Sequence, residues 1–277
     1  DNNITTISVF CRVGSVDEPN QLQGVSHFLE HMLFKGTDNR PTPKDIAGEL
    51  DEVGAYFNAY TDKNLTSYIV KVNSDYARRG IDILSDMIVN SKIRPEDMVT
   101  EKNVVVEEIN KSKDNPNEDI EEDYYKLIFH NNPLGHSIGG DEKKILSYPP
   151  DLVKKYYKKY YSSNNIIISI ATNITFSKIK KLIQNSYFPN LVNTNIYHNY
   201  PKLAKQLKPN IHIEHKDLEQ VHLMIGFPVC SMYHNDKYVL DLVKIILAGN
   251  MSSRLFIDMR EKHGLSYSVS VSYLSLI

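Results

Sequence analysis

The spacing of hydrophobic and polar positions changes several times along the chain, and each change predicts a new element. Residues 4–13 alternate apolar and polar side chains, which predicts a half-buried strand. From about residue 22 to residue 35 the apolar side chains recur every three or four positions, as on an amphipathic helix. Gly36 stands where a left-handed cap would end that helix. The first predicted elements are therefore a strand and a helix.

The next segment predicts further helices around a stretch of strand. Thr42, Pro43 and Asp45 have the order of a helix cap, a first turn and a capping-box acid. Residues 55–72 are rich in Tyr, Thr, Val and Ile, and they predict two strands around a polar turn or one long bent edge strand. Helices are expected at residues 43–53, 75–90 and 95–112.

Two more amphipathic helices, at residues 116–129 and 149–161, flank a glycine-rich loop. The loop, residues 133–142, lacks the Gly-Lys-Ser/Thr sequence of a phosphate-binding loop, so we interpret it as structural. A buried strand is expected over residues 164–174 and a closing helix over residues 176–187.

A change in composition predicts a domain boundary. Residues 190–208 are rich in Asn, Pro and Lys and have no sustained period, which is typical of a linker. Residues 209–277 weakly repeat the earlier order, with strands at 211–229 and 265–274 around two helices. We expect one domain over residues 1–189 and the start of a related, truncated one over 209–277. The chain begins at Asp1 and ends in a strand-like stretch, so we interpret it as an excerpt.

Composition excludes several classes of function. The chain of 277 residues has 32 Lys and Arg, 34 Asp and Glu and a net charge of -2, so binding to nucleic acid is not expected. Its apolar runs are shorter than the roughly 20 residues of a membrane-spanning helix, and we expect a soluble protein. Cys11 and Cys230 are interpreted as buried thiols, and we expect no targeting segment within this excerpt. The compartment stays open between bacterial cytoplasm or periplasm and mitochondrial matrix.

The segment GVSHFLEHMLFKGT places His27, Glu30 and His31 on the predicted first helix. At positions i, i+3 and i+4 these side chains share one helix face. Two neutral imidazoles at this spacing can bind neighbouring corners of a tetrahedral zinc ion, while the carboxylate can reach a water on the same metal. This is the inverted H-x-x-E-H arrangement. The alternative is a pair of core-edge histidines beside a solvated glutamate, and a third ligand must decide.

The helix predicted at residues 95–112 supplies a candidate for the third ligand. Glu101 and Glu108 are seven positions apart and lie about 20° from each other around the helix axis. Val104 and Val105 flank them, which predicts that Glu108 faces packed structure. A buried carboxylate is costly without a cation, so Glu108 is the candidate ligand, and a helix-boundary ion pair is the alternative. Glu107 is expected to be a solvated surface charge.

These residues resemble the pitrilysin, insulin-degrading enzyme and mitochondrial processing peptidase family of zinc metallopeptidases. Its signature is an H-x-x-E-H helix and a distant glutamate that follows another acid by seven positions, as here. The segments HFLEHMLFKGT, EKNVVVEEI, PLGHSIGG and REKHGLSYSV are similar to family segments and occur in family order. The resemblance, to the processing-peptidase-like branch, implies an α+β fold of two related halves. Each half is an antiparallel β-sheet packed with α-helices, and the second is incomplete in this chain.

The resemblance also implies a zinc endopeptidase with one Zn²⁺ per chain. His27, His31 and Glu108 would be the metal ligands, and Glu30 would be the general base for a zinc-activated water. Glu101 would orient His27 or His31 through the other ring nitrogen.

Further residues are implied in substrate binding and catalysis. A peptide substrate would lie as an added β-strand against residues Phe57, Asn58, Ala59 and Tyr60. Arg260 and Tyr267, from the second half, would stabilise the oxyanion that forms at the scissile carbonyl.

Two functions stay open. The first is hydrolysis of peptides, or of unfolded and presequence-like segments, by a zinc endopeptidase. The second is a non-catalytic peptide-binding or structural subunit of a processing-peptidase-like complex. The intact motif favours the enzyme. The partner is either a second copy in a homodimer or a sister subunit in a heterodimer.

Overall fold

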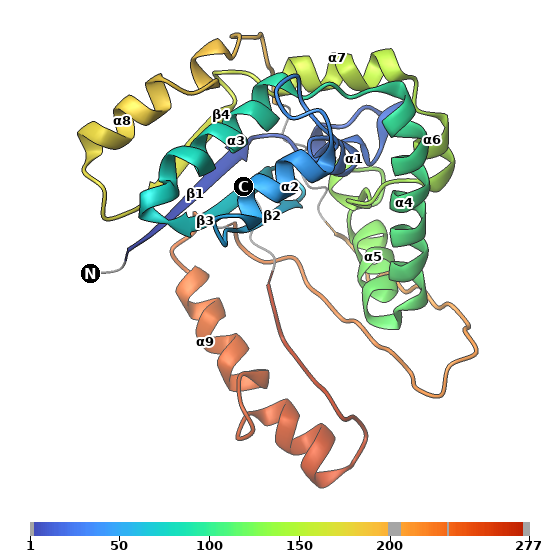
Figure 1. The fold of residues 1–277 in the computed structure, drawn as a ribbon. Coiled ribbons are helices and arrows are strands. Elements are labelled where there is room, and N and C mark those ends of the chain that lie inside the picture. Colours follow the sequence, from blue (N-terminus) through green and yellow to red (C-terminus); the bar gives the residue numbers. More distant parts are fainter. Residues whose placement is uncertain (1–2, 199–205, 232, 274–277) are drawn as a thin grey trace. The chain divides into compact units, whose positions relative to one another are not determined.

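The structure is a computed structural model that describes residues 3–198, 206–231 and 233–273 (Figure 1). The chain divides into two compact units, Asp1–Met224 and Ile225–Ile277. The predicted linker, residues 190–208, includes residues 199–205, which lie outside the described residues. Within the described ranges, every helix is too short or too polar to cross a membrane.

The first unit is built on a four-stranded sheet of order β2-β3-β1-β4. Every neighbouring pair in it is antiparallel. The hairpin of β2 and β3 confirms two strands around a polar turn. The strands are β1 (Ile4–Cys11), β2 (Tyr56–Thr61), β3 (Thr66–Asn73) and β4 (Ile166–Ala171).

Strand β4 was expected to be buried, and this expectation is wrong because its residues alternate between half-buried and exposed. The strand pairs with β1 at the edge of the sheet, and the Ile167 side chain is 65% exposed. Ile166, Ile168 and Ile170 pack against the core, so β4 alternates in burial although Ser169 is its only polar residue.

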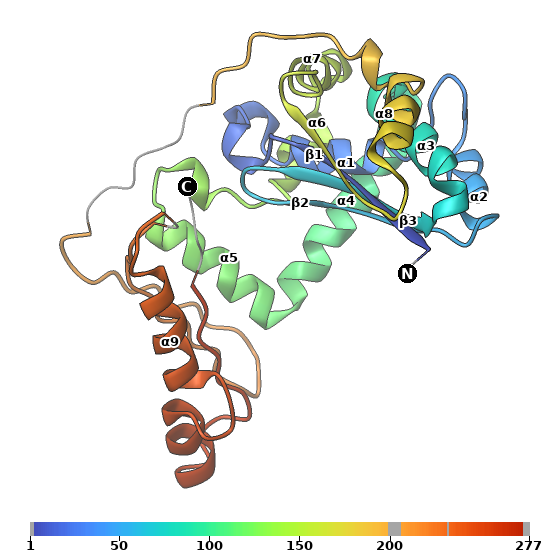
Figure 2. The ribbon, with the colours of Figure 1, turned by 90° about the vertical axis from the view of Figure 1, so that its left-hand side faces the viewer.

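Helices cover the packed face of the sheet, and Figure 2 shows α1, α3 and α7 on the same side of it. Helix α3 approaches the strands closely, because a Cβ on its Gly80 would meet Ile7 and Val70 at 2.9 and 3.2 Å. Helix α6 follows the glycine-rich loop and was not predicted. The helices of this unit are α1 (Val25–Met32), α2 (Pro43–Asp51), α3 (Ala77–Asn90), α4 (Pro95–Asp114), α5 (Pro116–Ile128), α6 (Glu142–Ser147), α7 (Pro150–Tyr160) and α8 (Phe176–Gln184).

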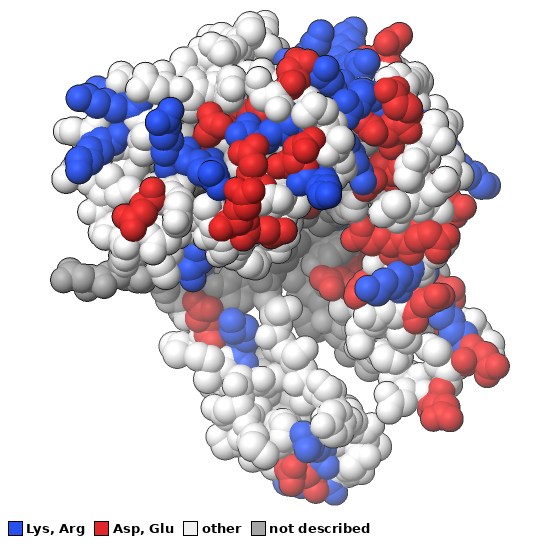
Figure 3. All heavy atoms as spheres, viewed as in Figure 1, with Lys and Arg blue, Asp and Glu red and all other residues white. Residues whose placement is uncertain are grey.

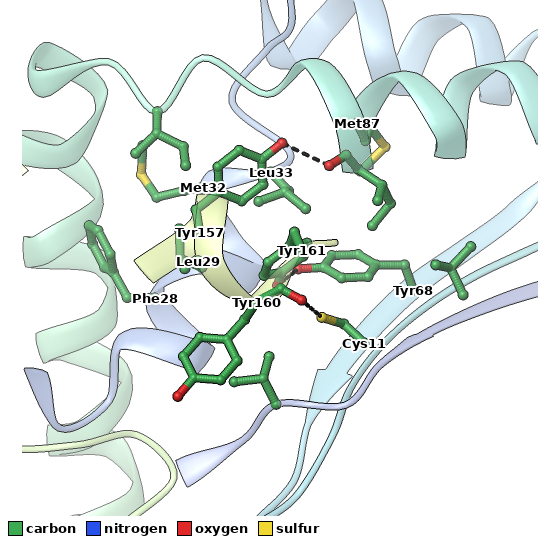
Figure 4. Packing of buried hydrophobic residues seen from close by; sticks show 14 of the residues in the cluster. Cys11, Phe28, Leu29, Met32, Leu33, Tyr68, Met87, Tyr157, Tyr160 and Tyr161 are labelled. Carbon is green, nitrogen blue, oxygen red and sulfur yellow. Dashed lines mark hydrogen bonds between the residues drawn. The ribbon is translucent and has the colours of Figure 1, made fainter. Parts of the chain in front are cut away.

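The core fixes the rotation of α1 about its own axis. Phe28, Leu29 and Met32 are fully buried on one side of this helix, in the core drawn in Figure 4. The Phe28 ring lies edge-on to the ring of Tyr148. Burying three such side chains contributes roughly 5–8 kcal/mol, so this side of the helix is held firmly. The opposite side of α1 therefore carries His27, Glu30 and His31, whereas the polar Ser26 is buried. Cys11 is a buried free thiol, as predicted, whereas the free thiol Cys230 is only half-buried, so the prediction of burial is wrong for Cys230.

The second unit contains α9 (Lys237–Ala248) and a π-helical turn at Phe256–Lys262. The strands expected at residues 211–229 and 265–274 do not form in the part of the chain that the structure describes, which excludes residue 274. A strand is defined by hydrogen bonds to a neighbouring strand, and these segments have no such neighbour among the described residues.

Candidate active site

The start of α1 is held by a buried carboxylate outside the helix. Gly24 precedes the helix with a φ of 93°, a conformation that favours glycine. Glu18 accepts hydrogen bonds from the backbone N–H groups of Gly24 and Ser26 at 2.6 and 2.8 Å. Burial raises the pKa of Glu18 to about 7, and these two bonds oppose the rise. Glu18 thus satisfies two of the free donors at this helix end.

Three of the predicted site residues converge at the polar side of α1. His27 Nε2 lies 3.3 Å from His31 Nε2, and Oε2 of Glu108 from α4 lies 3.8 and 3.4 Å from these two atoms. The three ligand atoms all lie within 4.8 Å of one another. The sequence spacing therefore does bring two imidazoles and one carboxylate together.

Glu101 holds the outer ring nitrogen of His31. Its Oε1 lies 2.8 Å from His31 Nδ1, and its Oε2 pairs with Lys35. The prediction left open which histidine Glu101 contacts, and in the structure it is His31. This contact places Nε2 of the same ring toward His27 and Glu108.

The expectation that Glu108 faces packed structure is wrong. Its side chain is 50% exposed, and the neighbouring Val104 is 45% exposed. The buried acid of α4 is Glu101, which is 2% exposed and lies on the same side as Val105. The two glutamates are close in angle, but the buried residues of α4 end at Val106 along the chain, and Glu108 follows them next to the two histidines.

Opposite shifts in pKa distinguish the two histidines. Burial, with the nearby His31, lowers the pKa of His27 to about 4, so its ring is neutral at pH 7. Burial also opposes the charge on His31, but hydrogen bonds and negative charges from Glu101 and Glu108 outweigh it and raise the pKa to about 9. The bond from His31 lowers the pKa of Glu108. With His27 neutral and His31 protonated, the pair of histidines therefore carries one positive charge beside the carboxylates of Glu101 and Glu108.

This donor set fits a zinc ion. Ligand atoms at roughly 2.0–2.1 Å from a tetrahedral zinc ion are about 3.3 Å apart, and the observed separations are 3.3, 3.4 and 3.8 Å. His27 Nδ1 is buried, whereas Nε2 of the same ring faces His31 Nε2 and Glu108 Oε2, so Nε2 is the ring atom directed toward the other two ligand atoms. Two imidazoles and one carboxylate leave a fourth position open, which is typical of catalytic zinc sites.

Glu30, the predicted general base, lies on the same side of α1. Its Oε2 accepts a hydrogen bond from Thr61 Oγ1 at 2.6 Å. Burial raises the pKa of Glu30, and the bond from Thr61 opposes this shift.

A cavity of about 350 Å³ joins these residues to the edge of the sheet. Its walls come from α1, β2, α4, α5 and the glycine-rich loop, which contributes Ser137, Ile138 and Gly139. Asp119 and Glu122 of α5 line it together with Glu30 and Glu108. Acidic side chains gather over α5 in Figure 3. Lys113 is the one lysine or arginine among the described residues that line the cavity, so the four carboxylates give the cavity wall a net negative charge.

Strand β2 presents a free edge beside this cavity, and Ala59 and Tyr60 line it. Phe57 and Ala59 are half-buried, whereas Asn58 and Tyr60 point away from the core. Asn58 Oδ1 accepts a hydrogen bond from the Ala59 N–H at 2.9 Å, so a side chain of the strand itself satisfies this edge donor. An added peptide strand would replace that bond.

Arg260 and Tyr267 lie together in the second unit. The Arg260 guanidinium lies 5.1 Å from the centre of the Tyr267 ring, and its Nη1 donates to the Tyr267 carbonyl at 3.4 Å. Tyr267 is 82% exposed. Their predicted role at the scissile carbonyl stays a prediction.

Sequence reasoning missed several neighbours of the site. Thr61, Lys35 and the loop residues Ser137 to Gly139 contact the site residues or line the cavity. Lys35 carried a signal, because it follows His31 by four positions in the segment predicted to be helical, although α1 ends at Met32. The contacts of Thr61 and of the loop depend on packing between distant segments and had no local signal.

Comparison with known families agrees with this geometry. A family model described as Insulinase (Peptidase family M16) matches residues 1–142, and one described as Peptidase M16 inactive domain matches residues 148–276. Both family models thus belong to the M16 class of peptidase domains, and the first covers the residues that carry the histidine–glutamate cluster. The chain belongs to the insulinase family, peptidase family M16, which confirms the predicted family.

Relatives with curated names are called zinc proteases. "Uncharacterized zinc protease YmxG" of Bacillus subtilis is 36% identical over 277 residues, covering 97% of this chain and 66% of the relative. An "Uncharacterized zinc protease" of Rickettsia felis is 38% identical over 264 residues, covering 95% and 63%. The chain thus spans slightly less than two thirds of the length of these relatives.

Solved structures confirm the predicted α+β fold. A protease from Helicobacter pylori matches with a TM-score of 0.90 at 22% identity, covering 99% of this chain and 67% of that one. Pitrilysin matches with a TM-score of 0.67 at 21% identity, covering 74% and 22%. At these identities the likeness concerns the fold alone.

Proposed function

We propose that the protein is a zinc-dependent endopeptidase whose metal site lies in this chain. His27, His31 and Glu108 would hold one Zn²⁺, and Glu30 would be the general base. The observation that carries this proposal is the convergence of the three ligand atoms within 4.8 Å, in one cavity with Glu30. The names of the relatives support the same class of activity.

Each residue has a defined task in this reaction. When bound, zinc would supply positive charge that polarises the water and the scissile carbonyl. Glu30 would take a proton from the attacking water and deliver it to the leaving amine. Glu101 would keep the His31 ring oriented with Nε2 toward the metal. Arg260 and Tyr267 would stabilise the oxyanion.

The substrate proposed is an extended or unfolded peptide, including presequence-like segments. The free edge of β2 can bind main-chain groups of many sequences, because backbone pairing does not depend on side chains. The acidic wall formed by Asp119 and Glu122 favours a basic side chain in the cavity. Lys216 of the chain contacts Asp119, so a cation already lies against this wall.

The test combines metal content with cleavage. The whole protein should contain one zinc ion per chain and cleave a quenched peptide library, with activity lost on chelation and restored by zinc. Glu108→Gln should weaken zinc binding by about 10-fold or more, because it removes the charged ligand. Glu107→Gln is the matched control, since Glu107 is the exposed neighbour of Glu108 on α4, and it should change neither property.

Two results would contradict the proposal in different ways. A zinc-replete protein that cleaves no peptide would favour the non-catalytic subunit. Full zinc affinity in the Glu108→Gln variant would show that Glu108 is not a ligand.

A further inference from the structure

Thr61, the last residue of β2, contacts the proposed general base. Its hydroxyl donates to Glu30 Oε2 over 2.6 Å. Among the residues that the structure describes, Thr61 is the one hydrogen-bond partner of the Glu30 carboxylate. A single bond therefore fixes the orientation of this carboxylate.

The alternation of β2 explains why Thr61 can reach Glu30. The packed face of the sheet carries Phe57, Ala59 and Thr61, which are half-buried, whereas the intervening residues are exposed. Glu30 projects from α1 on this side, where both residues line the same cavity. The geometry of a strand and a helix, rather than a flexible loop, thus holds the two groups together.

The backbone of Thr61 faces the free edge of the sheet. The N–H of the next residue, Asp62, donates to the Leu65 carbonyl at 2.8 Å, on the side of β3. Successive residues of an antiparallel strand direct their backbone groups to opposite sides, so the N–H and C=O of Thr61 point away from β3. The Ala59 N–H, two residues earlier, bonds to Asn58 Oδ1 and not to β3, in agreement with this alternation. Thr61 therefore offers backbone groups to an added strand and its hydroxyl to Glu30.

We propose that Thr61 is a positioning residue that links the bound peptide strand to the general base. The peptide would pair with the backbone at Thr61, and the hydroxyl would hold the Glu30 carboxylate toward the cavity in which the scissile bond lies. The Thr61 hydroxyl itself exchanges no proton with the substrate. This inference rests on the proposed peptidase function.

The test compares Thr61→Val with Thr61→Ser in the whole protein. Valine keeps the branched shape of threonine and removes the hydroxyl, whereas serine keeps the hydroxyl and removes the methyl group. We expect Thr61→Val to lower kcat by about 10- to 100-fold, because the variant loses one hydrogen bond to a charged group. KM should change by less than about 3-fold. Thr61→Ser should restore kcat to within about 3-fold of the parent. Zinc content and thermal unfolding should be unchanged in both variants.

Several outcomes would overturn the inference. If Thr61→Val keeps kcat within about 2-fold of the parent, the hydroxyl is not needed. If Thr61→Ser is as impaired as Thr61→Val, the methyl group matters through packing. A rise in KM alone would assign Thr61 to binding and not to positioning of the base.

A second measurement separates this inference from the proposed function. The carbon-13 shift of the Glu30 carboxyl, assigned by its absence in Glu30→Gln, should change in zinc-free Thr61→Val and stay in place in Thr61→Ser. If the carbon-13 shift of the Glu30 carboxyl does not change in Thr61→Val, the hydrogen bond from Thr61 to Glu30 is contradicted, whatever the peptidase activity of the variant. Suppose that the zinc-replete parent cleaves no peptide but the carbon-13 shift of Glu30 changes in Thr61→Val as expected. This result would contradict the peptidase function and the positioning role of Thr61, but the hydrogen bond between Thr61 and Glu30 would stand.

Discussion

Glu101 Oε1 lies 2.8 Å from Nδ1 of His31, the ring nitrogen opposite the one that faces His27 and Glu108. Glu101 is 2% exposed and also pairs with Lys35, so its position is fixed by packing and by charge. Hydrogen bonds and charges of His31 and Lys35 outweigh burial and lower the pKa of Glu101, which keeps the carboxylate ionised. A buried anion behind a histidine increases the basicity of the ring toward a metal.

Replacing Glu101 should weaken zinc binding without abolishing it. Glu101→Gln keeps the size of the side chain and removes the charge, so we expect zinc affinity to fall about 10-fold or more. Competition with a chelator of known affinity measures this change. Glu96→Gln, an exposed acid in the first turn of α4, is the control and should leave affinity unchanged. Equal affinities in parent and Glu101→Gln would exclude a role in orienting His31.

The sequence predicts well those features that depend on local spacing. The helix spacing of His27, Glu30 and His31 brings these side chains to one face, because the period of a helix does not depend on the rest of the fold. The capping residues of α2 are another example, since Thr42 and Asp45 bond to each other's backbone as predicted.

Features that depend on packing between distant segments were predicted poorly. The angle between Glu101 and Glu108 was correct, but the sequence does not show where along α4 the buried residues end. Strand β4 was predicted to be a buried strand, and only the sheet order shows it to be an edge. The contact of Thr61 with Glu30 joins two elements 31 positions apart.

A proline at Ala59 should impair substrate binding without breaking the sheet. The Ala59 N–H bonds to Asn58 and not to β3, so its loss removes a donor of the free edge only. We expect KM for a peptide substrate to rise roughly 3- to 10-fold, the value of one backbone hydrogen bond. Tyr60→Pro is the contrasting variant. The backbone N–H of Tyr60 faces β3, so losing this N–H should destabilise the fold. An unchanged KM in Ala59→Pro would contradict strand addition at β2.

Two glycines should respond oppositely to alanine. Gly140 has a φ of 91°, and a Cβ there would lie 2.4 Å from the Gln23 carbonyl oxygen and 2.5 Å from Gly24 Cα. Gly140→Ala should therefore destabilise the protein by about 2–4 kcal/mol and disturb the start of α1. Gly48 lies inside α2, and its Cβ would meet nothing within 4 Å, so Gly48→Ala should stabilise by about 0.5–1 kcal/mol. Urea unfolding measures both changes, and destabilisation of similar size in both variants would contradict this account.

Metal removal should lower thermal stability. A ligand present at 1,000 times its dissociation constant stabilises the folded state by about 4 kcal/mol, so chelation should shift the melting temperature downward by several degrees. Added zinc should reverse the shift in the parent protein and fail to do so in His27→Ala. A melting temperature that does not respond to chelator or zinc would contradict a metal site between α1 and α4.

The central claim is that Glu30 acts on the reacting water and does not hold the metal. The most direct measurement is zinc stoichiometry together with peptide cleavage for the whole protein and its Glu30→Gln variant. We predict one zinc ion per chain in both proteins and cleavage by the parent alone, with the rate of the variant lower by about 100-fold or more. Equal cleavage by both proteins, or loss of zinc with the substitution, would contradict the assignment of Glu30 as the general base.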